Sequence, residues 1–121
     1  MPGQITDTIP ELPVADVVQT QEYYRDKLGF EIAWNWEDER GGVSCGNVIL
    51  FFVQQDSFEP RVTWISSTDV DAVCAEWWER GATIIEEPED KPWQIREFTM
   101  QDLNGHHFRV YRGVEEEGED G

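Results

Sequence analysis

Residues 16–32 read DVVQTQEYYRDKLGFEI, and residues 69–84 repeat the pattern as DVDAVCAEWWERGATI. In each copy a segment with helical spacing begins at an Asp-Val pair and ends at a glycine, and a short apolar segment follows. Aspartate is a favoured N-cap residue, and glycine favours the left-handed conformation that ends many helices. Two such copies in one short chain predict two similar half-domains.

The two copies predict two amphipathic helices. The first begins after Asp16, with Gln19 in the capping-box position, and the second begins near Thr68 or Asp69. The apolar face of the first helix consists of Val17, Tyr24 and Leu28. The second helix follows the i, i+3, i+4, i+7 pattern with Val70, Val73, Cys74 and Trp77, so we expect these residues in the core.

Short apolar segments between turn residues predict the strands. Val48–Gln54 is almost continuously apolar and predicts a strand buried on both faces, whereas Pro88–Pro92 predicts a polar loop. Turns are expected at Gly41-Gly42, at Gly46-Asn47 and at the DLNG sequence of residues 102–105. The other expected strands are residues 5–12, 30–37, 43–45, 61–67, 83–86, 94–101 and 106–112.

This order predicts an α+β fold with two βαβββ modules in a single domain over residues 5–112. The modules cover about residues 5–54 and 61–112. Residues 113–121 contain EEEGEDG and predict a disordered acidic tail.

The chain has 121 residues and a formal net charge of −17. This charge disfavours nucleic acids and anionic membranes as partners and would attract a cationic ligand. Selection for solubility or for a saline habitat explains the same acidity, and the sequence leaves the two causes open. No segment approaches the roughly 20 apolar residues of a membrane span, and no secretory leader is visible, so we expect a cytoplasmic protein. The isolated Cys45 and Cys74 predict two buried thiols, with a disulfide or a nucleophile as alternatives.

Three motifs together resemble a known superfamily. They read VADVVQTQEYYRDKLGFEI (14–32), GNVILFF (46–52) and WQIREFTMQDLNGHHFRVY (93–111). The first is similar to a V-x-D…FY…LGF block, and the last is similar to an REF…D-P-D-G-N ending in which Leu103 replaces the proline. In this order, over roughly Ile5 to Arg112, they resemble the glyoxalase/bleomycin-resistance/dioxygenase superfamily, also called vicinal oxygen chelate proteins.

The resemblance implies that the two modules form a curved, cupped mixed sheet, with the helices outside and the ligand in the cup. Many members of the superfamily are dimers, and in several of them the site is completed across the two chains. The enzymes hold a divalent metal with His and Glu side chains. The bleomycin-resistance proteins are dimers that have no catalytic metal and sequester a cationic glycopeptide drug.

The resemblance also locates the positions at which the metal-dependent relatives carry their ligands. By motif offset, these positions are Ile9, Phe51, Val62 and Arg109. None of the four side chains is a usual metal ligand, and an arginine repels a cation. We therefore expect no metal, no cofactor and no catalytic residue of the family type.

The only histidines, His106 and His107, are adjacent and suggest a metal site at first sight. Neighbouring residues of a strand point to opposite faces, so the two cannot both face the cup. If Arg109 faces the cup, as its donor-equivalent position implies, His107 and Tyr111 do so too. His106 is then expected to be exposed near the turn. His107 is either a hydrogen-bonded residue of the cup wall or a contact of the ligand.

The same alternation lists other side chains that we expect in the cup: Glu11, Pro13, Ile49, Phe51, Val53, Trp64 and Ser66. Aromatic faces suit planar or cationic ligands, although core packing or a dimer interface explains tryptophans equally well. Five carboxylates near the mouth of the cup could attract a cation or could simply be solvated: Glu11, Glu37, Asp38, Glu39 and Glu97. The candidate ligand-binding residues are Glu11, Trp34, Trp36, Phe51, Trp64, Trp93, Phe98, His107, Arg109 and Tyr111.

Three functions fit these observations. The first is a homodimeric binding protein of the bleomycin-resistance type, which sequesters a cationic, aromatic small molecule. The second is an enzyme without the usual metal site, in which His107 acts with Tyr111 or Glu11 as acid–base groups. The third is a sensor for an unknown small ligand. The sequence leaves the ligand, the biological role and any residual activity open.

Overall fold

The structure is a computed structural model that describes residues 3–113. The first module contains β1 (Glu11–Val14), α1 (Val17–Leu28), β2 (Glu31–Trp36), β3 (Arg40–Cys45) and β4 (Val48–Gln54). The second contains β5 (Val62–Ser66), α2 (Val70–Glu79), β6 (Thr83–Lys91), β7 (Ile95–Gln101) and β8 (His107–Gly113). Of the expected acidic tail, residues 114–121 lie outside the described part.

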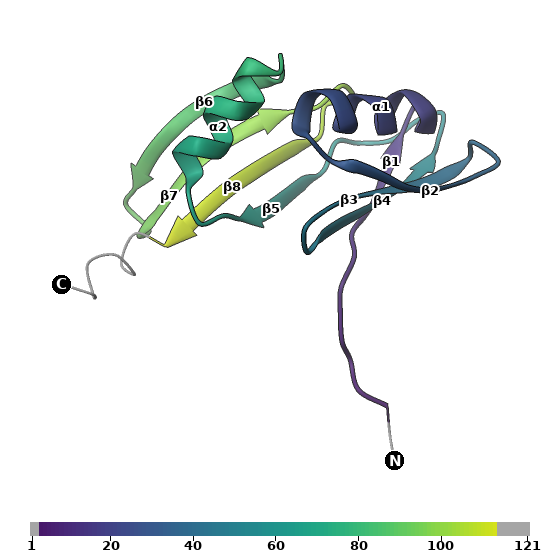
Figure 1. Ribbon diagram of the computed structural model, residues 1–121, viewed down its shortest axis with the longest axis horizontal. Coiled ribbons are helices and arrows are strands. Elements are labelled where there is room, and N and C mark those ends of the chain that lie inside the picture. Colours follow the sequence, from purple (N-terminus) through teal and green to yellow (C-terminus); the bar gives the residue numbers. More distant parts are fainter. Residues whose placement is uncertain (1–2, 114–121) are drawn as a thin grey trace.

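The two modules have the same topology, and both helices lie on one side of the two sheets (Figure 1). The strand orders are β1-β4-β3-β2 and β5-β8-β7-β6. In each sheet the first strand pairs in parallel with the last, and the other pairs are antiparallel. The predicted α+β fold of two βαβββ modules is therefore confirmed. Neither helix of the described residues is long and apolar enough to cross a membrane.

Both helices begin at the predicted aspartates. The Gln19 backbone N–H donates to Asp16 Oδ1 at 2.8 Å, and the Ala72 N–H donates to Asp69 Oδ1 at 3.0 Å. Each aspartate therefore satisfies a backbone donor that the first helical turn leaves unpaired. At the end of α1, Gly29 has a φ of 78°, in the left-handed region where glycine is favoured.

The core lies between the helices and the sheets, and Tyr24 of α1 is at its centre. The Tyr24 ring packs against Phe30 and Phe52 of its own module and against Phe108 of the other, with centroids 5.1–5.8 Å apart. In the second module, Trp77 of α2 packs on Phe98 at 5.6 Å. The predicted burial of Trp77 is confirmed, and aromatic contacts join the two modules.

The turn that precedes β8 holds the modules together through polar contacts. Asp102 Oδ2 accepts a 2.6 Å hydrogen bond from the Tyr24 hydroxyl, and the Asn104 amide donates to Thr20 Oγ1 at 3.0 Å. His106 is fully buried: its Nδ1 accepts the Arg61 N–H at 2.9 Å, and its Nε2 lies 2.6 Å from the Pro13 carbonyl oxygen. The expectation that His106 is exposed was wrong, because its ring bridges β1 and the segment that leads into β5.

Several predicted boundaries were also wrong. Gly41 and Gly42 lie inside β3, and the turn is at Glu37-Asp38, where both residues have positive φ. A Cβ on Gly41 would lie 2.7 Å from the Gln21 amide nitrogen of α1, so close packing explains this glycine better than a turn does. Strand β1 begins at Glu11 rather than at residue 5, because only Glu11–Val14 pair with β4. The preceding segment extends away from the sheets (Figure 1).

Strand β6 contains most of the expected loop of residues 88–92. It is an edge strand with register shifts, and such strands tolerate Pro88 because one of their edges needs no hydrogen bonds. Strand β4 matches its predicted bounds, but its Ile49 is exposed rather than buried. Both cysteines are free thiols, and neither is buried as expected. Cys45 is exposed beside the β3–β4 turn, and Cys74 is half-buried.

The buried Tyr24 hydroxyl, which donates to Asp102, should make stability fall at high pH. Burial, followed by the Asp102 charge, raises the pKa of Tyr24 well above 10. Above about pH 10 the unfolded chain therefore releases the Tyr24 proton while the folded chain retains it, so stability is full below that pH and decreases as pH rises. Urea unfolding between pH 8 and 11 should show a shallower decrease for Tyr24→Phe, together with a loss of about 1–2 kcal/mol at pH 8.

Tyr23→Phe is the matched control. Tyr23 is half-buried, and burial followed by the Asp102 charge raises its pKa less strongly than that of Tyr24. Its replacement should change the alkaline slope less. Equal slopes for wild type and Tyr24→Phe would contradict the prediction.

Candidate functional site

The face of both sheets opposite the helices, here called the open face, carries the predicted cup residues. In the second sheet Trp64, Arg109, Thr99 and Glu86 lie side by side across four strands. In the first sheet Glu11, Phe51, Gly42 and Trp34 do the same. The strand alternation predicted from the sequence therefore places candidate residues from both modules on the open face.

The first-sheet patch consists of Glu11, Trp34, Trp36, Arg40 and Phe51. The Trp34 and Phe51 rings meet edge to face at 5.1 Å. A Cβ on Gly42 would lie 2.5 Å from Trp34 Nε1, so this glycine leaves room for the indole. Glu11 and Arg40 form an exposed ion pair at 3.1 Å beside Trp36. The patch is an aromatic surface with one neutralised ion pair.

The Arg109 cluster occupies the open face of the second sheet and consists of Trp64, Glu86, Trp93, Glu97, Thr99, Arg109 and Tyr111. Arg109 Nη1 lies 3.6 Å from carboxylate oxygens of both Glu86 and Glu97. The guanidinium carbon lies 5.7 Å from the centre of the Trp64 ring, which also contacts Tyr111 at 5.5 Å. One arginine and two glutamates leave the cluster with a net negative charge.

Glu97 is a carboxylate on the open face that is only 1% exposed. Its Oε1 accepts a hydrogen bond from Trp93 Nε1–H at 3.1 Å, and its Oε2 faces Arg109. The Thr99 hydroxyl donates to Glu86 Oε1 at 2.9 Å. Buried carboxylates require such partners, and each oxygen of Glu97 has one. Glu86 and Thr99 were not predicted from the sequence, and Glu97 was expected only among the solvated or cation-attracting carboxylates at the mouth of the cup.

Two further candidates, Phe98 and His107, differ in where their side chains lie. Phe98 is fully buried and packs on Trp77 beneath α2, so the structure removes it from the open face. His107 is on the open face and is half-buried, with its Nε2 3.1 Å from Gln101 Oε1. That contact agrees with the expectation of a hydrogen-bonded wall residue.

The positions implied for a family metal do not suit one. Phe51, Val62 and Arg109 lie on the open face but offer two apolar side chains and a cation, and Ile9 precedes β1. Among residues 3–113, no three His, Cys, Asp or Glu side chains are grouped to hold a metal. The cation that faces Glu86 and Glu97 is the protein's own guanidinium. The donor set therefore does not fit a divalent metal at these positions.

A family model described as Glyoxalase/Bleomycin resistance protein/Dioxygenase superfamily matches residues 4–110. No curated protein matches the sequence. Similar solved structures include the bleomycin-binding protein of Streptomyces verticillus in complex with copper(II)-bleomycin, with a TM-score of 0.77 and 24% identity over 89% of this chain and 96% of that one.

Two further solved structures have similar folds. A bleomycin resistance determinant encoded on the transposon Tn5 has a TM-score of 0.80 and 19% identity, over 90% of this chain and 98% of that one. TnmS3, an antibiotic-binding protein from a Streptomyces species, has a TM-score of 0.73 and 23% identity, over 90% and 97% of the respective chains. At these sequence identities, the comparisons show a shared fold and nothing more specific.

Proposed function

We propose that this chain, which belongs to the glyoxalase/bleomycin resistance protein/dioxygenase superfamily, is a small-molecule binding protein that sequesters an aromatic, cationic ligand on its open face. The Arg109 cluster is the observation that carries the proposal. Aromatic rings from three segments surround a group of charges that is negative overall. Rings favour planar ligands through stacking, and a negative surface beside them favours a positive charge.

The burial and the partners of the two carboxylates indicate how a cationic ligand would be held. Glu97 is buried and already contacts Trp93 and Arg109, whereas about half of the Glu86 side chain is exposed. Glu86 is therefore the carboxylate that a ligand cation can approach, and Trp64 and Trp93 supply exposed rings within the same cluster. The similar folds of a bleomycin-binding protein and an antibiotic-binding protein support this class of ligand.

We also propose that two copies of the chain form the complete site. The open face of one chain exposes a large apolar area, with Trp36 53%, Trp64 46% and Trp93 56% accessible. An aromatic surface of this kind marks an interface or a ligand site rather than ordinary protein surface. A second chain that faces it would turn two open surfaces into enclosed clefts.

Calorimetric titration with bleomycin-type cationic drugs tests the function. Binding should weaken about tenfold in Trp64→Ala, since a stacked or cation–π contact contributes about 1–2 kcal/mol. Leu103→Ala is the control, because Leu103 is exposed to nearly the same extent (45% against 46%) but lies in the turn between β7 and β8, outside the Arg109 cluster. Sedimentation of the same sample should give a dimer. An absence of heat at millimolar drug would exclude this drug class, and equal affinities of the two variants would exclude the open face.

The structure offers no comparable support for an acid–base enzyme. His107 and Tyr111 are four residues apart on β8, which separates them by roughly 13 Å along the strand. Glu11 belongs to the other sheet and is paired with Arg40. The three groups proposed as acid–base partners thus lack the mutual contact that such catalysis requires. A turnover that disappears in His107→Ala would reverse this conclusion.

A further inference from the structure

We propose a second binding site, for a small organic cation with an apolar body, in a hollow between α2 and β6. The hollow has a volume of about 310 Å³ and is lined mainly by Asp71, Cys74, Trp78, Ile84, Glu87 and Pro88. It lies on the helix side of the second sheet, since Ile84 pairs with Met100, which is buried beneath the helices. The site is therefore separate from the open face and does not depend on the function proposed for that face.

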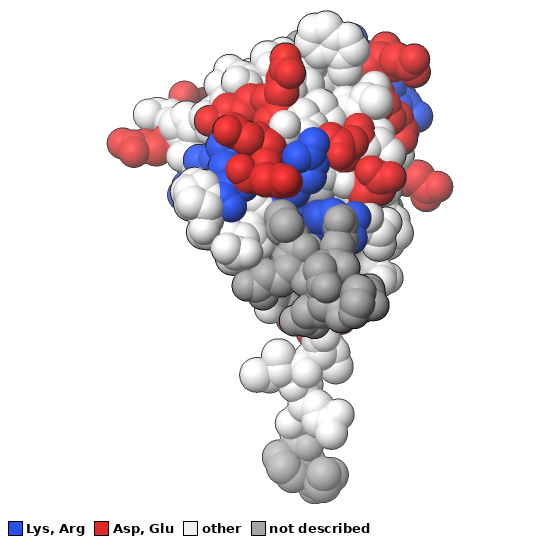
Figure 2. Space-filling model, turned by 90° about the vertical axis from the view of Figure 1, so that its left-hand side faces the viewer, with Lys and Arg blue, Asp and Glu red and all other residues white. Residues whose placement is uncertain are grey.

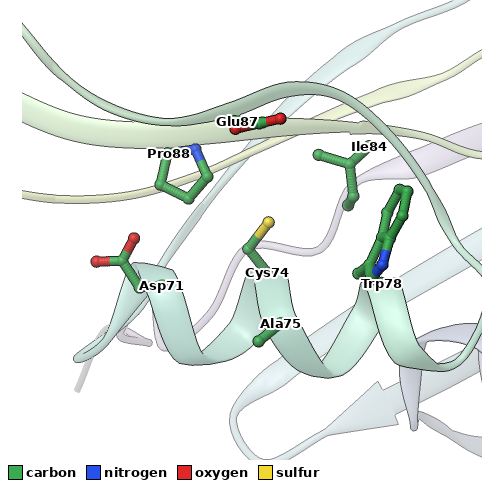
Figure 3. A pocket seen from close by; sticks show the side chains of 7 residues that line it. All are labelled: Asp71, Cys74, Ala75, Trp78, Ile84, Glu87 and Pro88. Atoms are coloured by element: carbon green, nitrogen blue, oxygen red, sulfur yellow. The ribbon is translucent and has the colours of Figure 1, made fainter.

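The shape of the hollow suits a molecule with two different ends. Asp71, Cys74 and Trp78 lie on one side of α2, and Figure 3 shows the Trp78 indole beside Ile84 at one end and Asp71 beside Pro88 at the other. The Cys74 thiol lies between them and points toward β6. Trp78 is 67% exposed, so most of its ring surface is available to a guest. The volume is at the lower end of the roughly 300–1,000 Å³ of ligand pockets, which fits one ring better than a drug-sized molecule.

The charges around the hollow favour a cation. Arg96 forms ion pairs with Asp71 at 2.9 Å and Asp90 at 3.0 Å. Glu87 has no ion-pair partner among residues 3–113, and it is one of the β6 residues that line the hollow. Burial and then the negative charges of Asp71 and Glu87 raise the pKa of the Cys74 thiol, which agrees with a negative potential inside the hollow.

The wider surface around this site has the same character. Figure 2 shows Asp and Glu side chains gathered with fewer Lys and Arg on the outer edge of the second module. The exposed acids of β6 include Glu86, Glu87, Glu89 and Asp90. Such a surface raises the local concentration of cations near the mouth. An apolar floor under an acidic rim selects cations that also carry an apolar group.

Alkylation of the two cysteines in the full chain tests the site. The probe is 2-phenylethylammonium, compared with its neutral isostere 2-phenylethanol, and N-ethylmaleimide labelling is followed by mass spectrometry. The ammonium compound should slow labelling of Cys74 at least fivefold and leave Cys45, which is exposed elsewhere, unchanged. The alcohol should need at least fivefold higher concentration for equal protection. No protection of Cys74, equal protection of both thiols, or equal potency of the two compounds would overturn the proposal.

Three variants locate the binding. Glu87→Gln should weaken protection about fivefold, in line with the loss of one partly exposed charge contact. Glu79→Gln removes the same charge from α2 outside the hollow and should leave protection unchanged. Trp64→Ala, which alters the open face, should also have no effect. Equal losses in Glu87→Gln and Glu79→Gln would mean that only overall charge matters, and a loss in Trp64→Ala would place the probe on the open face. Either result contradicts the second site.

Discussion

Replacement of His106 by alanine should lower the free energy of unfolding by about 4 kcal/mol. The imidazole is fully buried and serves two backbone groups from different segments. Because Nδ1 accepts the Arg61 N–H, Nε2 carries the proton and donates to the Pro13 carbonyl oxygen. Each buried group left without a partner costs roughly 1–3 kcal/mol. The cavity left by the ring, which also stacks on Phe58, adds to this cost.

His107 provides the matched control, because the same substitution one residue later removes much less. Its ring is half-buried and makes one side-chain contact, with Gln101 at 3.1 Å. His107→Ala should therefore cost less than about 1 kcal/mol. Urea unfolding of both variants at pH 8 measures the difference. Equal losses would mean that His106 does not hold the modules together.

The sequence predicted the position of His107 correctly and the exposure of His106 wrongly, for a physical reason. The resemblance implied that Arg109 faces the cup, and strand alternation added His107 and Tyr111. The register of β5 and β8 confirms that these three residues share one face. Alternation also separated His106 from these residues, but it cannot tell exposed surface from a junction with another module. The Pro13 carbonyl is far away in the sequence. Contacts of this range are not encoded in a local pattern.

The sequence itself could have excluded Phe98 from the ligand-binding residues. The DLNG turn fixes the register of the β7–β8 hairpin, which pairs Phe98 with Val110. Val110 alternates with Arg109 and Tyr111, so Phe98 had to lie on the helix side. Glu86 is different, because its place beside Thr99 depends on register shifts in β6 that only the folded sheet displays.

The glycine pair of β3 shows a further limit. Gly41 and Gly42 resemble a turn, yet each lacks a side chain because another group occupies that space. Gly41 faces Gln21 and Val17 of α1, and Gly42 faces Trp34 and Phe51 of the open face. Adjacent glycines therefore predicted a local conformation where the structure has close packing on both faces of one strand.

Arg109→Met should cost about 3 kcal/mol, because it keeps an apolar side chain on the open face but leaves the buried Glu97 carboxylate without its cation. Trp93 Nε1–H would remain as the hydrogen-bond donor to that carboxylate, at 3.1 Å. Arg40→Met is the control on the first sheet. The Arg40–Glu11 pair has the same kinds of charges, but both side chains are about half exposed, so its loss should cost less than about 1 kcal/mol.

The double variant Arg109→Met with Glu97→Gln distinguishes lost attraction from an unpaired buried charge. A neutral amide can keep the hydrogen bond from Trp93 and requires no cation, so the second substitution should recover most of the loss. Glu11→Gln added to Arg40→Met should recover little, because the exposed Glu11 is solvated with or without its partner. Denaturant unfolding of the two cycles gives both coupling energies. If Glu97→Gln fails to rescue Arg109→Met, then Arg109 stabilises the open face through packing on Trp64, and the charge of Glu97 is not what requires it.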